Sequence, residues 1–135
     1  MLTKSISMQK NPKILLVDDN KDLLQVVQII LKGQGFDTVL AESVEEAERK
    51  IKFYHPALVL MDVFIGDEDG RLLCSQLKND KGTNDISVIL MSGQESTELN
   101  ENDIMDLADD FLPKPLQYND LVGTVRQHYH QSIRA

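Results

Sequence analysis

Carboxylate, hydroxyl and ammonium side chains come directly after the short apolar runs of this chain. They are Asp18 and Asp19 after residues 14–17, Asp62 after 57–61, Ser92 after 88–91, and Lys114 after 111–113. Runs this short and this apolar predict strands buried on both faces, as in a parallel sheet covered by helices. In such sheets the site lies beyond the carboxyl ends of the strands. We therefore expect these groups to share one edge, where they suit a metal ion and a phosphoryl group.

Asp62 carries the strongest of these signals. It ends a fully apolar run, and burying its charge without a partner is costly. Three converging carboxylates repel one another, so either one proton is retained or a cation lies among them. A divalent ion that prefers oxygen ligands, Mg²⁺, resolves the repulsion. Asp18 and Asp19 also have a plainer interpretation, because Asp often caps a following helix.

With a cation in place, Asp62 is a candidate nucleophile toward phosphorus, since carboxylates form aspartyl-phosphate. Lys114 can supply charge to one phosphoryl oxygen, and Ser92 can donate a hydroxyl hydrogen bond to another. Each has an ordinary alternative, because Ser92 begins a turn-like sequence and Lys114-Pro115 can simply end a strand. A cis peptide at Pro115 would aim Lys114 at the site. The co-location of all five groups is what the prediction depends on.

The segments between these residues predict the elements that position them. Strands are expected at 14–17, 36–41, 57–62, 88–91 and 111–112. Helices are expected at 23–31, from 43 onward, at 71–79 and at 118–129, with a loop at 66–70 and a short helix near 103–108. Ser43 and Glu46 form a capping-box signature. The alternation predicts one doubly wound α/β domain with a five-stranded parallel sheet, flavodoxin-like strand order 2-1-3-4-5, and helices on both faces.

Length and composition set the class of the protein. Its 135 residues, 41% of them hydrophobic, predict one domain at 13–130, with a flexible segment at 1–12 and a tail at 131–135. A net charge of -8 argues against direct binding to nucleic acid. The sequence has no signal-peptide pattern and no apolar run of about 20 residues for a membrane span. A cytoplasmic protein is expected.

The remaining reactive residues are expected to be structural. His55, His128 and His130 have no Cys or carboxylate cluster at ligand spacing and are predicted on the surface. Cys74 is predicted in the core, and as the single cysteine it cannot form an internal disulfide, which fits a reducing compartment. Residues 95–110 carry seven acidic side chains and no Lys or Arg, which indicates a solvated face or a docking face for a basic partner.

The motifs together resemble the receiver domain of bacterial response regulators over residues 13–129. The matching segments are Val17-Asp18-Asp19, Leu60-Met61-Asp62, Asp69-Gly70, Met91-Ser92 and Phe111-Leu112-Pro113-Lys114-Pro115. The resemblance implies that Asp62 accepts a phosphoryl group from a histidine kinase or phosphotransfer protein, with Mg²⁺ as cofactor. It also implies that the chain is not an enzyme acting on a separate substrate.

The resemblance assigns a role to each site residue. Asp19 and Asp62 would ligate Mg²⁺ directly, Asp18 would help through water, and the backbone carbonyl of Phe64 would be a further ligand. Lys114 would contact the phosphoryl group.

Signalling would depend on two further residues. Ser92 matches the switch hydroxyl, and Phe111, three residues before Lys114, matches the switch aromatic. Phosphorylation would draw Ser92 inward and turn Phe111. The surface of the predicted fourth helix, fifth strand and fifth helix would then change for a downstream protein target.

The chain also departs from the family pattern. Gly66 stands where the family commonly has Pro, which loosens the loop beside the metal. Phe64 and Gln94 occupy the two positions that tune dephosphorylation. The acidic fourth helix lacks the basic residue that some DNA-binding members use to dimerise, so either a monomer or a phosphorylation-dependent dimer is open.

Three other functions are weaker. A haloacid-dehalogenase-type phosphatase needs a second Asp two residues after the nucleophile, where this chain has Phe64. A flavin or nucleotide binder needs a phosphate cradle after the first strand, where Asp18 and Asp19 would repel phosphate. A receiver-like scaffold that works without phosphorylation would not need all five site groups.

Overall fold

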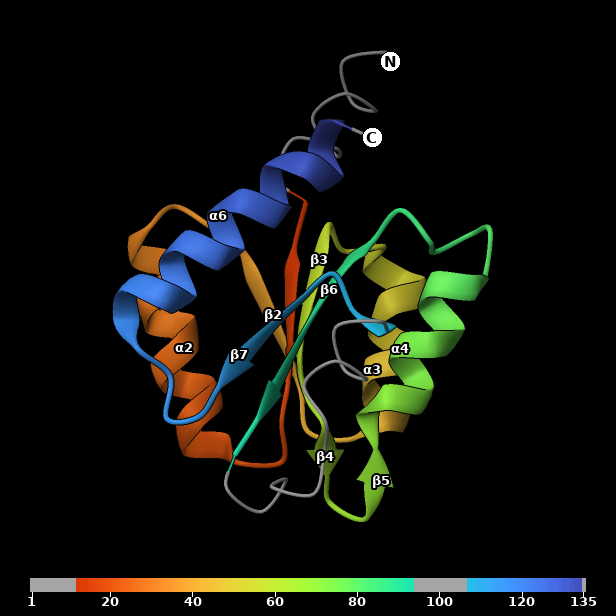
Figure 1. Ribbon diagram of the computed structural model, residues 1–135, viewed down its shortest axis with the longest axis horizontal. Coiled ribbons are helices and arrows are strands. Elements are labelled where there is room, and N and C mark those ends of the chain that lie inside the picture. Colours follow the sequence, from red (N-terminus) through yellow and green to blue (C-terminus); the bar gives the residue numbers. More distant parts are fainter. Residues whose placement is uncertain (1–11, 94–106, 135) are drawn as a thin grey trace.

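Five parallel strands form the centre of the molecule (Figure 1). The computed structural model describes residues 12–93 and 107–134. The strands lie in the order β2-β1-β3-β6-β7, which confirms the predicted 2-1-3-4-5 order once the separate hairpin strands β4 and β5 are left out. Their bounds are β1 Ile14–Val17, β2 Thr38–Ala41, β3 Leu58–Asp62, β6 Ser87–Ser92 and β7 Asp110–Pro113.

Helices cover both faces of this sheet, as predicted. α2 (Lys21–Gly33) and α6 (Tyr118–Arg134) lie on one face, and α3 (Val44–Tyr54) and α4 (Gly70–Asn79) lie on the other (Figure 1). Successive strand residues point to opposite faces. Leu15 and Val17 therefore belong to the α3–α4 cluster, whereas Ile14 and Leu16 belong to the α2–α6 cluster.

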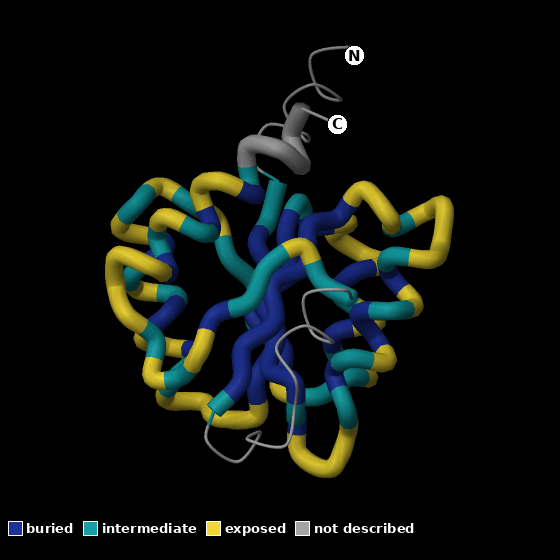
Figure 2. Tube along the Cα trace, in the orientation of Figure 1, coloured by how far each residue is buried: buried dark blue, intermediate teal, exposed yellow. Residues whose placement is uncertain are grey.

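Burial follows this layering. The central strands are buried and the outward turns of the helices are exposed (Figure 2). Among the described residues, no helix combines the length and the apolar character needed to cross a membrane.

Local sequence explains where two of the helices begin. The Asn20 side chain accepts a hydrogen bond from the Leu23 N–H at 3.1 Å and caps α2. Ser43 caps α3 by accepting from the Glu46 N–H at 3.1 Å, as the capping-box signature predicts. The Glu46 carboxylate accepts from the Glu42 N–H at 2.8 Å. Because Asn20 is the cap of α2, the capping interpretation of Asp18 and Asp19 is wrong.

The loop predicted at residues 66–70 is in fact part of a short hairpin. β4 (Phe64–Ile65) pairs antiparallel with β5 (Glu68–Asp69), and Gly66 lies in the turn with φ of 61°. Glycine adopts a positive φ without steric cost, which permits so tight a turn. Strands of two residues are too short to produce a recognisable alternation, so the pattern missed them.

The prediction that His128 lies on the surface is wrong. His128 is 6% exposed, and its Nε2 lies 2.8 Å from an Asp110 carboxylate oxygen. That carboxylate offsets the cost of burying the imidazole. His55 is exposed, as predicted, with its Nε2 3.3 Å from an Asp85 oxygen.

Cys74 lies in the core, as predicted, and its Sγ donates to the Leu107 carbonyl at 3.4 Å. Burial raises the pKa of this thiol to about 12, so it is unreactive. Several predictions lie outside the described residues: the Gln94 position, most of the acidic segment and of the helix near 103–108, and the His130 side chain. The last helix continues past its predicted end at Tyr129.

Gly70 makes the closest backbone approach to the strand that ends at Asp62. Its N–H donates to the Val63 carbonyl at 2.6 Å, and a Cβ there would lie 2.4 Å from the Asp62 carbonyl oxygen. We expect Gly70→Ala to lower the free energy of unfolding by about 2 kcal/mol, since the obstructing atom is backbone and cannot rotate away. Urea denaturation would measure the loss.

Gly123→Ala is the matched control, because an added Cβ on α6 meets nothing within 4 Å. We expect this change to be neutral or to stabilise by up to about 1 kcal/mol, through helix propensity alone. Equal stability of the two variants would contradict the packing constraint at Gly70.

Candidate functional site

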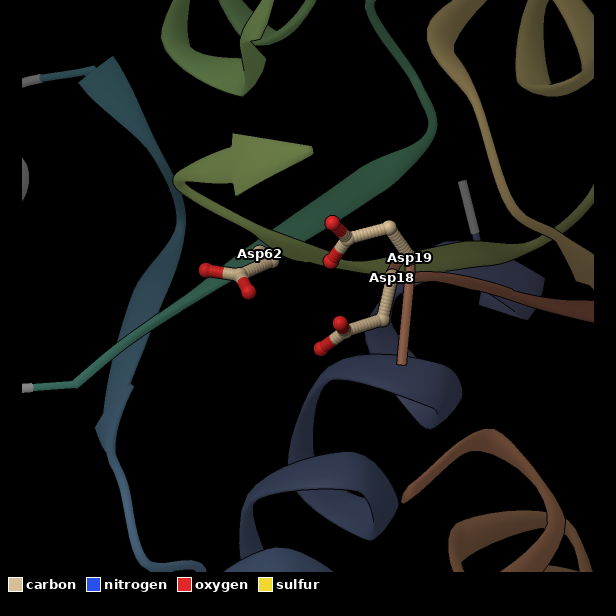
Figure 3. Close-up of side chains that lie close together, drawn as sticks. All are labelled: Asp18, Asp19 and Asp62. Atoms are coloured by element: carbon tan, nitrogen blue, oxygen red, sulfur yellow. The ribbon is translucent and has the colours of Figure 1, made fainter. Parts of the chain in front are cut away.

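Three carboxylates converge at one end of the sheet, as predicted. Asp18 and Asp19 follow β1, and Asp62 is the last residue of β3 (Figure 3). β1 and β3 are hydrogen-bonded neighbours with Val17 paired to Met61, so the next residue on each strand reaches the same edge. One carboxylate oxygen from each Asp lies within 4.8 Å of the others. Asp18 and Asp62 are buried, and Asp19 is exposed.

Lys114 lies among these carboxylates. Its Nζ donates to one oxygen of Asp18 at 2.8 Å and to one oxygen of Asp62 at 2.7 Å. The Lys114–Pro115 peptide is cis, and the Lys114 N–H donates to the Ser92 carbonyl at 2.8 Å. Lys114 directly follows β7, and its contacts with Asp18 and Asp62 show that the ammonium reaches the site from the end of that strand, as predicted from the sequence.

Burial and the Lys114 ammonium act in opposite directions on the pKa of Asp62. Burial raises its pKa most, and the nearby Asp18 charge raises it further. The Lys114 hydrogen bond and charge, and a hydrogen bond from the Phe64 N–H at 3.3 Å, lower it without reversing the shift. The pKa of Asp62 is therefore above its usual value, which means that the folded structure disfavours the charged form.

Lys114 shows the converse balance. Burial disfavours its charge, but hydrogen bonds to Asp18 and Asp62 outweigh burial and raise the pKa of the ammonium. Lys114 is therefore charged at neutral pH. One ammonium facing three carboxylates leaves an excess of negative charge that favours a further cation.

Ser92 and Phe111 lie on the strands next to Asp62. Ser92 is 9% exposed at the end of β6, where Asp62 pairs with Met91 and Ser92 pairs with Pro113. This register places Ser92 between the strands that carry Asp62 and Lys114. Phe111 is partly buried and packs against the α3–α4 cluster.

Backbone amides hold the two acidic residues that follow β1. The Asn20 N–H donates to Asp18 at 3.0 Å, and the Gly66 N–H donates to Asp19 at 3.1 Å. The sequence did not reveal the Gly66 contact or the direct Asp18–Lys114 ion pair. The partners lie 47 and 96 residues apart, so no local spacing indicates them.

The donor set fits Mg²⁺. It consists of carboxylate oxygens, the ligands that this hard cation prefers. The Asp19 carboxylate is exposed to solvent. The unbalanced negative charge around Lys114 gives the same indication. Asp18, Asp19 and Asp62 are therefore the residues that could hold this cation.

Comparison with known proteins decides the family. The sequence profile of the response regulator receiver domain matches residues 14–126. The chain belongs to this family. Receiver domains are phosphoacceptors in two-component signalling and are generally not enzymes in the usual sense.

Relatives support the same assignment. The chain is 30% identical over 114 residues to the DNA-binding response regulator MtrA of Mycolicibacterium paratuberculosis, covering 84% of this chain and 49% of that protein. It therefore spans about half the length of this relative. It is 26% identical to Protein PilG of Pseudomonas aeruginosa, covering 86% of both.

Solved structures agree in fold. A response regulator receiver protein from Pseudomonas putida matches with a TM-score of 0.77 and 29% identity, over 87% of this chain and 97% of that one. The receiver domain of a signal transduction histidine kinase from Syntrophus aciditrophicus matches with a TM-score of 0.79 and 28% identity, over 92% and 94%.

The raised pKa of Asp62 has a consequence for stability. A folded-state pKa above the unfolded one means that this group contributes most to stability below the unfolded pKa, and that the contribution is lost as pH rises through the folded pKa. At pH 7 without metal, which is above the unfolded pKa, the Asp62 carboxyl group is therefore destabilising. We expect Asp62→Asn to raise the free energy of unfolding at pH 7 in EDTA, with the gain disappearing toward acid pH. Urea denaturation across pH would measure it.

Asp22→Asn is the matched control, because Asp22 is exposed in the first turn of α2. Its carboxylate favours the helix dipole, so its loss is expected to lower stability by about 0.5 kcal/mol. A loss of stability in Asp62→Asn at pH 7 would contradict the electrostatic balance described for Asp62.

Proposed function

We propose that Asp62 is the phosphorylation site of this receiver domain. A carboxylate oxygen of Asp62 attacks the phosphorus of a phosphohistidine on a partner protein, forming an O–P bond as the N–P bond breaks. The histidine nitrogen recovers its electron pair and leaves with the donor. The observation that carries the proposal is the Lys114 ammonium, held 2.7 Å from Asp62 inside a buried acidic cluster.

The surrounding residues stabilise the phosphoryl group and bind the cation. Lys114 offers its charge to one phosphoryl oxygen, and the Ser92 hydroxyl donates to another. Asp19 and Asp62, the carbonyl of Phe64, and Asp18 through water would hold Mg²⁺. When bound, Mg²⁺ supplies positive charge that offsets the developing negative charge on the transferred group.

Signal output is assigned to Ser92 and Phe111. Ser92 moving toward a phosphoryl oxygen would free space, into which the Phe111 ring turns. Phe111 is only partly buried against the α3–α4 cluster, so its ring adjoins both core and surface. The proposed output is a changed surface around β7 and α6 for a downstream protein, acting as a monomer or a phosphorylation-dependent dimer.

The proposed reactions of this chain are phosphorylation of Asp62 by a donor and the later dephosphorylation of Asp62. The chain transforms no separate substrate. A net charge of -8 favours protein partners over direct contact with nucleic acid. Because receiver domains usually act in the cytoplasm, we place phosphotransfer to Asp62 there.

Intact-mass measurement tests the phosphorylation site. After incubation with acetyl phosphate and Mg²⁺, we expect the native chain to gain one phosphoryl group, about 80 Da, as an acyl phosphate. Asp62→Asn should gain none. Asp109→Asn should behave as native, because the Asp109 carboxylate contacts Lys78 and the Val88 N–H at the start of β6, the strand end opposite Ser92. An unmodified native chain would favour the phosphorylation-independent scaffold.

A groove beside Lys114 suits the phosphodonor. Its volume is about 430 Å³, and it lies between α2 and the segment that leads from Lys114 into α6. Val26 and Tyr118 line it, and each is 53% exposed. An apolar helix of a histidine kinase or phosphotransfer protein, seated here, would hold its phosphohistidine next to Asp62.

Val26→Glu tests this docking surface. We expect phosphotransfer from any histidine kinase that phosphorylates the native chain to slow by about tenfold, because a charge would enter an apolar contact. Phosphorylation by acetyl phosphate should be unchanged, since a small donor needs no groove. Radiolabelled phosphotransfer would measure both rates.

Phe53→Glu is the matched control, since Phe53 is 80% exposed on α3, across the sheet from α2 (Figure 1). It should leave both rates as native. Equal slowing by the two substitutions would contradict docking at α2.

A further inference from the structure

The turn of the β4–β5 hairpin touches the acidic cluster. The Gly66 N–H donates to Asp19 Oδ2 at 3.1 Å, which joins this turn to the segment between β1 and α2. Within the described residues, the Asp19 carboxylate accepts no other hydrogen bond. The hairpin is therefore more than a connection between β3 and α4.

Asp19 differs from the other two carboxylates. Asp18 and Asp62 are buried and share the Lys114 ammonium, whereas Asp19 is exposed and, within the described part of the chain, forms no ion pair with that lysine. An exposed carboxylate on a flexible side chain samples several rotamers unless a hydrogen bond restricts it. Of the three, Asp19 therefore depends most on an outside group to point toward the cluster.

Gly66 meets two requirements at once. Its φ of 61° turns the hairpin, and its N–H is aimed at Asp19. An added Cβ at Gly66 would meet nothing within 4 Å, so space does not exclude a side chain there. What the position requires is a left-handed backbone and an N–H donor. Asn satisfies both requirements, whereas Pro satisfies neither.

We propose that the Gly66 backbone amide is a positioning group for Asp19. By holding Oδ2, it restricts the Asp19 side chain, of which one carboxylate oxygen lies within 4.8 Å of an oxygen of Asp18 and of Asp62, before any cation arrives. Carboxylates that ligate metals are commonly oriented by such outer hydrogen bonds, and losing one reduces metal affinity by about 10- to 100-fold. This inference rests on the proposed binding of Mg²⁺ at the cluster.

Calorimetric titration with MgCl₂ tests the proposal on the full chain. We expect Gly66→Pro to weaken Mg²⁺ binding by about tenfold, because the donor is lost and φ is forced negative. Gly66→Asn keeps the donor and tolerates the left-handed turn, so its dissociation constant should stay within about twofold of native. Thermal unfolding in EDTA checks that both variants fold.

The outcomes separate two failures. If the native chain does not bind Mg²⁺, the proposed metal site is wrong. If the native chain binds and Gly66→Pro binds equally well, the site stands and the role of Gly66 is wrong. Gly66→Asn weakened as much as Gly66→Pro would also overturn that role, since the donor would not be the deciding feature.

Amide hydrogen exchange on the native chain tests the contact without relying on Gly66→Pro folding. We expect exchange at the Gly66 amide to accelerate severalfold in Asp19→Ala and to stay slow in the native chain on adding MgCl₂. Fast exchange in the native chain, or loss of protection on adding MgCl₂, would show that the amide does not hold Asp19 in the metal-binding arrangement.

Discussion

The placement of one ammonium among buried carboxylates is the constraint on which this structure depends. Asp62 is 4% exposed and Asp18 is 1% exposed, and neither would be tolerated as an isolated charge at that depth. Lys114 satisfies both through hydrogen bonds of 2.7 and 2.8 Å. It offsets only part of the repulsion, because the pKa of Asp62 is still raised. The folded chain therefore retains an unbalanced acidic site.

The fold supplies what this arrangement needs. Neighbouring parallel strands end at the same edge, so β1, β3 and β7 deliver Asp18, Asp62 and Lys114 to one place without long loops. Gly70 lets the start of α4 pass against the Asp62 carbonyl, and the intervening hairpin returns toward Asp19. The buried sheet makes the strand ends rigid, whereas the hairpin adds a hydrogen bond to the exposed Asp19 carboxylate.

The sheet and most of the site residues could be predicted from the sequence, for a physical reason. Strands buried on both faces leave continuous apolar runs, and a polar residue that ends such a run marks the edge of the sheet. That reasoning located Asp62, Ser92 and Lys114 and the strand order. It failed where short-range pattern carries no information, as in the two-residue strands of the hairpin. It also missed the ion pair between Lys114 and Asp18, because these residues are 96 positions apart in the chain.

His128 is a different kind of miss, because a signal was present. Leu121, Val125 and His128 follow the spacing of one helical face, which indicates burial for all three. The surface prediction rested on the lack of a Cys or carboxylate cluster at ligand spacing and did not use this helical spacing. Asp110 supplies the partner that makes burial of His128 possible. A titratable residue on an apolar stripe therefore indicates a partner on the facing strand. β7 carries that partner at its first residue.

β7 connects the acidic site to the rest of the molecule. Its first residue, Asp110, holds α6 through His128, and Lys114, which follows its last residue, contacts Asp62. Phe111 lies between them and pairs with Leu90 of β6, the strand that ends at Ser92. A phosphoryl group on Asp62 would add negative charge beside Lys114, which already donates hydrogen bonds to two carboxylates. Under the proposed phosphorylation, a redistribution of these hydrogen bonds would act at the ends of β6 and β7, and β7 is the strand that carries Phe111.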